Sequence, residues 1–406
     1  MLTLKFGGTS MGNASRILDS SDIMISRAKV DRISVIVSAV AGVSNKLQES
    51  IDCCITGKNA NIFVTEIRKI HEDICADLMS RLSGFNATDV LSRLEPVLAD
   101  FARLLEAVSA FAECPPTIYS RIMGTGELLS SIIVEAVLLA KQQSILRLDS
   151  RELIFTTGCQ TEGDPDYIRT AAAFAPYRDG EKKNLPRILL LPGFICSWRA
   201  KSSDSDCVPG LLGRNGSDFS ASIAGAALGA SRVEFWTDVD GIYTADPRIV
   251  SDAILVDDMT YEEAMELSFF GSKVLHPKTL APLASKGIEA WSLNSHNPAA
   301  RVTRIGEGPF NTEKNAGPVR GISCLKNTAM VSVSGSGMKG RSGMAARIFA
   351  AVSKAGISIL LITQSSSEYT ISFCVRQNQA SAVMDVLSSE FDLELRERVI
   401  NLIEVK

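Results

Sequence analysis

The segment Leu2-Thr-Leu-Lys-Phe-Gly-Gly-Thr-Ser10 joins a short β-type run to two glycines and two hydroxyl residues, and a helical pattern follows it. Glycines without side chains let several backbone N–H groups converge on an anion. The helix N-terminus and the Lys5 ammonium would add positive charge. We therefore interpret Lys5 with Gly7, Gly8 and Ser10 as a candidate phosphate cradle. The plainer alternative is a strand-turn-helix with a surface lysine, because glycine pairs are common in turns.

Strand signals alternate with segments of helical period over the first 295 residues. Besides Leu2–Phe6, the strand candidates are Ser34–Val37, Ile145–Leu148, Ile154–Thr156, Ile188–Phe194, Val233–Thr237 and Ile288–Leu293. This order predicts an α/β domain with a largely parallel sheet over residues 1–296. Helical signals dominate from about 60 to 143, which indicates a helical subregion. Thr260-Tyr-Glu-Glu263 is a capping box that opens another helix.

The C-terminal part has a different pattern. Residues 297–318 are rich in Pro, Gly, Asn and Arg without apolar periodicity, which predicts a linker. Residues 319–406 follow the order β-α-β-β-α-β, which is the ferredoxin-like order. Its expected elements are strand Met330–Ser334, helix Arg341–Ala355, strand Ser358–Thr363, strand Tyr369–Val375, helix Gln379–Ser389 and a short strand near Leu393.

Composition excludes several classes of protein. The chain has 406 residues, 46% of them apolar, and a net charge of −4, so we expect two or three domains and no nucleic-acid partner. Its nine cysteines form no C-x-x-C pair, which argues against a disulfide framework or a zinc site and indicates a reducing, cytoplasmic compartment. The most apolar helical stretch, Ser131–Ala140, contains Glu135 and falls short of the ~20 residues of a membrane span, so no membrane partner is expected.

Two motifs are misleading. Gly335-Ser-Gly-Met-Lys-Gly340 matches a dinucleotide-binding G-x-G-x-x-G, but no acidic residue follows it before Glu368. Gly8-Thr-Ser-Met-Gly12 matches the G-x-S-x-G of a nucleophile elbow, but too little chain precedes it to supply an oxyanion loop. We therefore discard the nicotinamide, flavin and hydrolase interpretations.

Three further loops carry candidate binding residues. Gly213-Arg-Asn-Gly-Ser-Asp218 precedes a helix of small residues, and a structural helix cap is the alternative interpretation. Thr237-Asp-Val-Asp-Gly-Ile-Tyr-Thr-Ala-Asp-Pro-Arg248 follows a strand, where open α/β sheets place ligands, although a polar surface turn would also explain its aspartates. Gly271-Ser-Lys-Val-Leu-His-Pro277 contains Lys273, which by itself could be a solvated surface charge.

Together the four loops resemble the amino-acid kinase family, and within it the aspartate kinases. The matching segments are KFGGTS at 5–10, GRNGSD at 213–218, TDVDGIYTADPR at 237–248 and GSKVLHP at 271–277. Residues 38–42 and 124–128 also look like family segments, and the tail from about Met330 looks like an ACT domain, an amino-acid sensor. The resemblance implies a sheet sandwiched by helices followed by this ferredoxin-like α+β domain.

The resemblance also implies roles for individual residues. Lys5 would stabilise the transferring phosphoryl group and Asp218 would organise the centre. The substrate-binding residues would be Ser38, Ser44, Glu127, Arg214 and Ser217, with Arg214 on a carboxylate and Glu127 on the α-ammonium. The nucleotide-binding residues would be Lys5, Gly7, Gly8, Ser10, Thr237, Asp238, Tyr243, Arg248 and Lys273. Asn215 replaces a usual glycine, and it tolerates a positive φ better than most residues.

The implied reaction transfers the γ-phosphoryl of ATP, with Mg²⁺, to the β-carboxylate of L-aspartate and gives 4-phospho-L-aspartate for lysine, threonine and methionine biosynthesis. No residue set is expected to hold a metal on its own. Feedback inhibition, with lysine as the effector, would act through Ser334, Ser336, Gly337, Met338, Gly340 and Arg341 in a homodimer formed through the ACT-like region. Residues 321–326 and 399–405 look like the first strands of a second, incomplete ACT unit.

Two alternative functions remain at the level of sequence. Other kinases of the family share the fold, although the 237–248 motif followed by an ACT-like tail favours aspartate. The chain could instead be an amino-acid sensor without turnover, although such a sensor has no need of Lys5, Arg214 and Asp218 together. The 406 residues leave no segment for a fused homoserine dehydrogenase, so none is expected.

Overall fold

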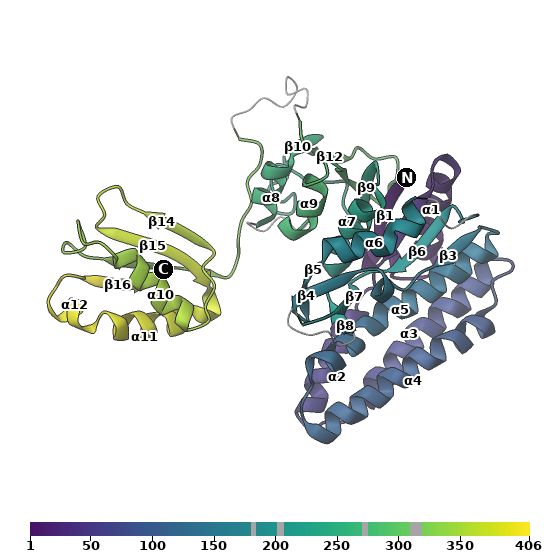
Figure 1. The fold of residues 1–406 in the computed structure, drawn as a ribbon, viewed down its shortest axis with the longest axis horizontal. Coiled ribbons are helices and arrows are strands. Elements are labelled where there is room, and N and C mark those ends of the chain that lie inside the picture. Colours follow the sequence, from purple (N-terminus) through teal and green to yellow (C-terminus); the bar gives the residue numbers. More distant parts are fainter. Residues whose placement is uncertain (180–183, 201–206, 270–274, 309–318) are drawn as a thin grey trace. The chain divides into compact units, whose positions relative to one another are not determined.

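The computed structural model describes residues 1–179, 184–200, 207–269, 275–308 and 319–406. The chain divides into two compact units, Met1–Ser323 and Cys324–Lys406 (Figure 1).

The N-terminal unit is built on an eight-stranded sheet with the order β10-β12-β11-β9-β1-β2-β6-β3. Its strands are β1 (Leu2–Phe6), β2 (Ile33–Val37), β3 (Ile145–Arg147), β6 (Ile188–Pro192), β9 (Arg232–Thr237), β10 (Asp258–Thr260), β11 (Glu289–Asn294) and β12 (Thr303–Gly306). Six neighbouring strands, from β11 to β3, pair in parallel, and β12 pairs antiparallel with β11. The predicted, largely parallel sheet is therefore confirmed.

A second, four-stranded sheet has the order β5-β4-β7-β8. Its strands are β4 (Phe155–Cys159), β5 (Glu162–Pro165), β7 (Ile195–Trp198) and β8 (Val208–Leu211). The sequence predicts β4 but neither β5 nor β8, whose sequences Glu-Gly-Asp-Pro and Val-Pro-Gly-Leu contain residues that are rare in strands.

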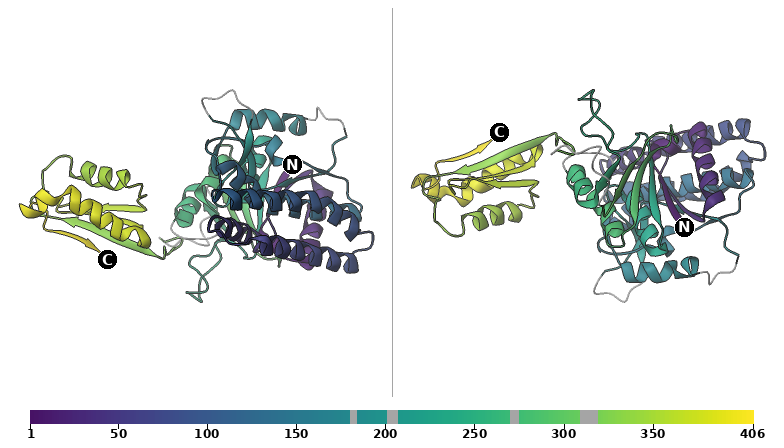
Figure 2. Two further views of the ribbon diagram at one scale, coloured as in Figure 1. Left: turned by 90° about the horizontal axis from the view of Figure 1, so that it is seen from below. Right: turned by 90° about the horizontal axis from the view of Figure 1, so that it is seen from above.

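Helices cover both faces of the large sheet (Figures 1 and 2). One face carries α1 (Ala14–Val30), α2 (Val43–Ile55), α3 (Asn61–Arg81), α4 (Ala87–Phe111) and α5 (Pro116–Ala140). The other carries α6 (Tyr167–Arg178), α7 (Gly216–Leu228), α8 (Tyr261–Phe269) and α9 (Pro277–Ala284). Short 3₁₀ turns occupy Gly8–Met11 and Ser150–Glu152. Helix α5 is long and apolar enough to cross a membrane, but 78% of its most apolar window is buried in the unit, as expected for a core helix.

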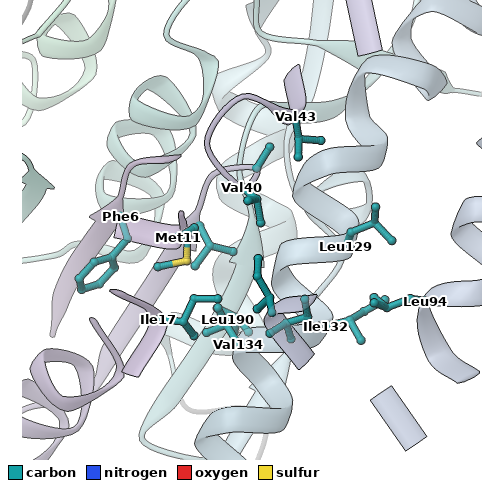
Figure 3. Close-up of a cluster of buried hydrophobic side chains, with 14 of the residues drawn as sticks. Phe6, Met11, Ile17, Val40, Val43, Leu94, Leu129, Ile132, Val134 and Leu190 are labelled. Atoms are coloured by element: carbon teal, nitrogen blue, oxygen red, sulfur yellow. The ribbon is translucent and has the colours of Figure 1, made fainter. Parts of the chain in front are cut away.

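The two faces have separate hydrophobic cores because side chains alternate along each strand. Val35 and Val37 pack with α1 and α5, whereas Ile36 between them packs on the α7 face. Figure 3 shows the first of these cores, where Ile17 lies beside Leu190 of β6 and Val134 of α5, and Met11 lies beside Phe6. A sheet buried on both faces needs apolar residues at consecutive positions, and β6 (Ile-Leu-Leu-Leu-Pro) has them.

The predicted linker is partly wrong. Strand β12 lies inside 297–318 and extends the large sheet by pairing with β10 and β11. The Thr303 hydroxyl donates to Val256 O at 2.6 Å and accepts from Ile242 N at 2.8 Å, so this position is buried in the first unit. A strand of this length, flanked by polar residues and glycine, has too few apolar residues to show the alternation that predicts a strand. Residues 309–318 lie outside the described residues.

The C-terminal unit is a four-stranded antiparallel sheet with the order β14-β15-β13-β16. Its elements are β13 (Thr328–Ser334), α10 (Met344–Lys354), β14 (Leu361–Gln364), β15 (Thr370–Arg376), a 3₁₀ turn (Gln377–Gln379), α11 (Ala380–Glu390), α12 (Asp392–Arg396) and β16 (Leu402–Val405). This is the predicted ferredoxin-like arrangement, with β14 and β16 as the two edge strands.

Two expectations for this unit are wrong. The residues around Leu393 form α12 rather than a strand. The last strand is β16, which pairs with β13, so 399–405 completes the first ACT-like unit instead of starting a second. Residues 321–326 form no strand either. The apolar residues of α12 and of β16 both fit a short β-type run, so the sequence alone does not distinguish the helix from the last strand.

Candidate functional site

Parallel pairing brings the carboxyl ends of five strands into one row. Phe6 of β1 is in register with Val37 of β2 and Trp236 of β9. Val37 pairs with Pro192 of β6, and Trp236 with Leu293 of β11. The segments that follow these strands therefore lie at one edge of the sheet, where open α/β sheets bind ligands. They begin at 7, 38, 193, 238 and 295.

Lys5 and Asp218 form an ion pair at this edge. Leu4 and Phe6 point into the α1/α5 core, so alternation along β1 turns Lys5 toward α7. The Lys5 Nζ lies 2.7 Å from Oδ1 of Asp218, in the first turn of α7, and both side chains are less than one-fifth exposed. A Cβ on Gly7 would come within 3.3 Å of Nζ, so glycine leaves room for the ammonium. The segments 5–10 and 213–218 therefore meet at this edge of the sheet.

The 213–218 loop has the geometry that its sequence predicts. Asn215, the N-cap of α7, has φ 57° and ψ 28°, a left-handed conformation, so the expectation of a tolerated positive φ is confirmed. Gly213 has φ 76°, and a Cβ there would lie 2.9 Å from Glu162 Cγ. The loop thus presents the start of α7, with Ser217 and Asp218, to the row of strand ends.

Glu127 lies in the interior of α5 beside this loop. It is 4% exposed, and its Oε1 accepts a long 3.5 Å hydrogen bond from the Ser217 hydroxyl. Its Oε2 has no hydrogen-bond partner among the described residues. Burial raises the pKa of Glu127 to about 8, against smaller opposing effects of hydrogen bonds from the Ala39 backbone and Ser217 and of the Lys5 charge. A buried carboxyl with a free oxygen is typical of a binding group.

Gly126 explains how this carboxyl comes close to the strand ends. A Cβ on Gly126 would lie 2.6 Å from the Cβ of Ala39, so α5 presses directly on the segment after β2. Ser38 belongs to that segment: its N–H donates to Phe6 O at 3.1 Å, and its carbonyl accepts from the Ser130 hydroxyl at 2.7 Å. The backbone of Ser38 therefore ties β1 to α5.

The side chains of Arg214 and Ser44 are exposed. Ser44 lies in the first turn of α2, after Gly42 with φ 82°. Burial, together with the nearby Lys278 and Arg214 cations, lowers the pKa of His276 at the start of α9. Arg214 thus lies near this helix, and it forms no ion pair with another described side chain.

Ser10 differs from the other cradle residues. Its side chain is fully buried, and its hydroxyl lies 2.9 Å from that of Ser295, at the end of β11. Ser295 in turn donates to Thr237 O at 3.0 Å. Ser10 thus connects the turn after β1 to β11 and β9. A Cβ added at Gly8 would lie 3.2 Å from Ala39 O, so the backbone of this turn lies close to the segment after β2.

The 237–248 segment brings polar groups to the same edge. The Thr237 hydroxyl donates to Asp238 at 3.1 Å, and Tyr243 OH donates to Asp240 at 3.3 Å. Arg248 is 72% exposed and pairs with Asp246 at 2.8 Å. Lys273, the last of the expected nucleotide contacts, lies outside the described residues.

Asp240 and Asn294 were not singled out from the sequence. The Asn294 amide donates to Asp240 Oδ1 at 2.7 Å, which joins the end of β11 to the loop after β9. The available signal was position alone: Asp240 lies within the motif, and Asn294 directly follows a predicted strand.

The comparisons with known proteins agree with this geometry. The model of the amino acid kinase family matches residues 1–294, and an ACT domain model matches 331–391. The chain is 30% identical over 391 residues to lysine-sensitive aspartokinase 3 of Escherichia coli, covering 95% of this chain and 80% of that protein. The chain belongs to the aspartokinases of the amino acid kinase family.

Other aspartokinases extend the comparison. The bifunctional aspartokinase/homoserine dehydrogenase of Haemophilus influenzae is 36% identical over 405 residues, covering 100% of this chain and 48% of that protein. The chain thus spans about half the length of the first curated relatives that it matches. The structure of E. coli aspartokinase III with aspartate and ADP superposes with a TM-score of 0.79 at 27% identity, covering 100% of this chain and 85% of that one.

The expected effector loop of this aspartokinase joins β13 to α10. Met338 is buried in the core of the C-terminal unit, whereas Ser336, Gly340 and Arg341 are exposed. Ser334 accepts a 3.1 Å hydrogen bond from the Thr370 hydroxyl. Gly337 donates to Val399 O at 3.1 Å, so the loop is held against the segment before β16.

Proposed function

We propose that the chain is an aspartate kinase that transfers the γ-phosphoryl of ATP to the β-carboxylate of L-aspartate. The observation that supports this most strongly is the Lys5–Asp218 pair at the carboxyl edge of the sheet. The end of β1, the start of α7 and the interior of α5 meet there, and these segments carry a buried acid, Glu127, and an exposed arginine, Arg214. E. coli aspartokinase III, with the same fold, binds aspartate and ADP.

The chemistry suits these residues. A carboxylate nucleophile is already ionised at neutral pH, so the reaction needs no general base. What it needs is relief from repulsion between two anions and in-line placement. Lys5 would stabilise the transferring phosphoryl group, while Asp218 holds the Lys5 ammonium in place and Gly7 and Gly8 expose backbone N–H groups to the phosphates.

Recognition of the substrate would use both ends of the amino acid. Arg214 would bind a carboxylate, and Glu127, with Ser217 beside it, would bind the α-ammonium. Ser38 and Ser44 would line the same pocket. Thr237, Asp238, Tyr243 and Arg248, with Lys273, would contact the nucleotide.

The donor set is compatible with Mg²⁺ that arrives with the nucleotide. Within the described residues no group of three or more His, Cys, Asp or Glu side chains could hold a metal. Mg²⁺ takes most of its ligands from phosphates and water and needs one or two carboxylates, and Asp238 or Asp240 at the strand edge could supply these. When bound, the ion would neutralise charge on the β- and γ-phosphates.

Regulation belongs to the same proposal. E. coli aspartokinase III has been crystallised with lysine and aspartate. Lysine would bind this chain at the exposed residues of the β13–α10 loop, in a homodimer formed through the ACT domain. Because the Met338 side chain is buried, the backbone of this loop rather than that side chain would face the effector.

ADP release tests the proposal. The full chain is assayed with ATP, Mg²⁺ and a panel of L-aspartate, L-glutamate, N-acetyl-L-glutamate and UMP, each with and without lysine. We expect release with L-aspartate alone and inhibition by millimolar lysine. Equal or greater release with another acceptor, or none with any, contradicts the assignment. An aspartate saturation curve that lysine does not shift contradicts the regulatory part alone.

A further inference from the structure

Glu127 is a buried carboxyl without a counter-ion. Its side chain is 4% exposed and its Oε2 has no partner among the described residues. No ion pair within 4.0 Å joins it to any described cation. Taking an isolated carboxylate out of water is costly, and such a group is normally neutral.

The nearest positive charge is already engaged. Lys5, from β1, is the cation whose field acts on Glu127, but its ammonium lies 2.7 Å from Asp218 of α7. The other groups that act on the carboxyl are the backbone N–H groups of Ala39, after β2, and of Glu127 itself, and the Ser217 hydroxyl of α7. None of these groups carries a charge. The Lys5–Asp218 pair thus balances one cation with one anion and leaves no positive charge for Glu127.

We propose that Glu127 is protonated before substrate binds and releases this proton when the ammonium of an amino-acid substrate binds beside Oε2. The O–H bond of the Glu127 carboxyl breaks, the proton passes to a base in solution, and the carboxylate pairs with the incoming ammonium without forming a covalent bond. The raised pKa of Glu127, about 8, agrees with this assignment. The inference rests on the proposed function, because it assumes an amino-acid substrate whose α-ammonium meets Glu127.

Proton release has a direct readout in calorimetry. L-aspartate is titrated into the full chain at pH 6.5 in phosphate, PIPES and imidazole, whose ionisation enthalpies differ. The slope of binding heat against buffer enthalpy counts the released protons. With a pKa of about 8 we expect about one proton at pH 6.5 and about a quarter at pH 8.5, and a Kd that falls about tenfold per pH unit between 6 and 7.5.

A matched pair of variants separates Glu127 from other groups. Glu127→Gln keeps the shape and removes the proton, so aspartate should bind more weakly with heat that does not depend on the buffer. Glu106→Gln, on the exposed side of α4, should keep the slope of the parent protein. Aspartate binding without proton release in the parent, or an unchanged slope in Glu127→Gln, overturns the inference while leaving the kinase assignment in place. Absence of both aspartate binding and ADP release overturns the proposed function and the inference together.

Discussion

Replacing Glu127 by Gln should stabilise the protein, and the gain should grow with pH. The pKa of Glu127 is raised from 4.5 to about 8, so between these values the folded chain binds a proton that the unfolded chain has lost. The unfolding free energy therefore decreases as pH rises through this window, by up to about 1.4 kcal/mol per pH unit. The amide of the Glu127→Gln variant does not titrate, so its unfolding free energy does not decrease with pH for this reason. Integrated from pH 5.5 to 8.5, the advantage of the variant should widen by about 3 kcal/mol.

Urea unfolding of both proteins at pH 5.5, 7.0 and 8.5 measures this difference, because the other titrating groups are shared and cancel. Glu106→Gln serves as the control, since a substitution on an exposed helix surface should change stability by less than about 0.5 kcal/mol at each pH. A difference in unfolding free energy between Glu127→Gln and the parent that stays constant from pH 5.5 to 8.5 would contradict a protonated Glu127 in the folded chain. It would show that the carboxyl is ionised in the fold and stabilised by a partner.

Four further predictions concern other positions. Lys5→Ala should lower kcat by about 100-fold or more, because the transferring phosphoryl group loses its cation. The affinity for ADP, measured by calorimetry, should change little. Turnover near that of the parent would show that Lys5 does not stabilise the transferring phosphoryl group. Asn215→Gly should leave the unfolding free energy nearly unchanged, whereas Asn215→Val should lower it by about 1–2 kcal/mol, because φ at this position is 57° and valine disfavours a left-handed conformation. Equal urea midpoints for the two variants would show that the position does not require a left-handed conformation. The Glu234 carboxylate is fully buried and forms ion pairs with Arg27 at 3.0 Å and Arg232 at 2.7 Å. Glu234→Ala should therefore lower the unfolding free energy, measured in urea, by about 3 kcal/mol. A decrease below about 1 kcal/mol would argue that these ion pairs contribute little to stability. A Cβ on Gly335 would lie 2.1 Å from Val399 O, so Gly335→Ala should speed amide hydrogen exchange in β13 and β16; unchanged exchange there would mean that the backbone adapts freely.

Three features of the fold follow from short stretches of sequence alone: the capping box at Thr260, strand β1 and the backbone conformation of Asn215. The capping box at Thr260 forms as expected, with Glu263 Oε2 accepting from Thr260 N at 2.9 Å. β1 begins and ends at the predicted residues, and its alternation places Lys5 opposite α7. Asn215 adopts the backbone conformation that its side chain tolerates.

The features that the sequence misses depend on contacts between distant residues. The hydroxyl partner of Ser10 lies 285 positions away in Ser295, and no local period specifies that pair. The burial of Glu127 depends on the close approach of Gly126 to the segment after β2. β12 and β16 are short strands whose place is fixed by the partners beside them, β11 and β13. Such pairings are set by tertiary packing rather than by propensity.

The chemical identity of the product distinguishes phosphoryl transfer to aspartate from every other reaction of ATP at this site. An acyl phosphate reacts with hydroxylamine to give a hydroxamate, so the full chain is incubated with ATP, Mg²⁺, L-aspartate and hydroxylamine, and the product is identified by mass spectrometry and NMR. We predict aspartate β-hydroxamate from the parent protein, and a yield at least about 100-fold lower from Lys5→Ala. No hydroxamate from the parent, or an equal yield from the two proteins, would contradict phosphoryl transfer to aspartate at the Lys5–Asp218 site.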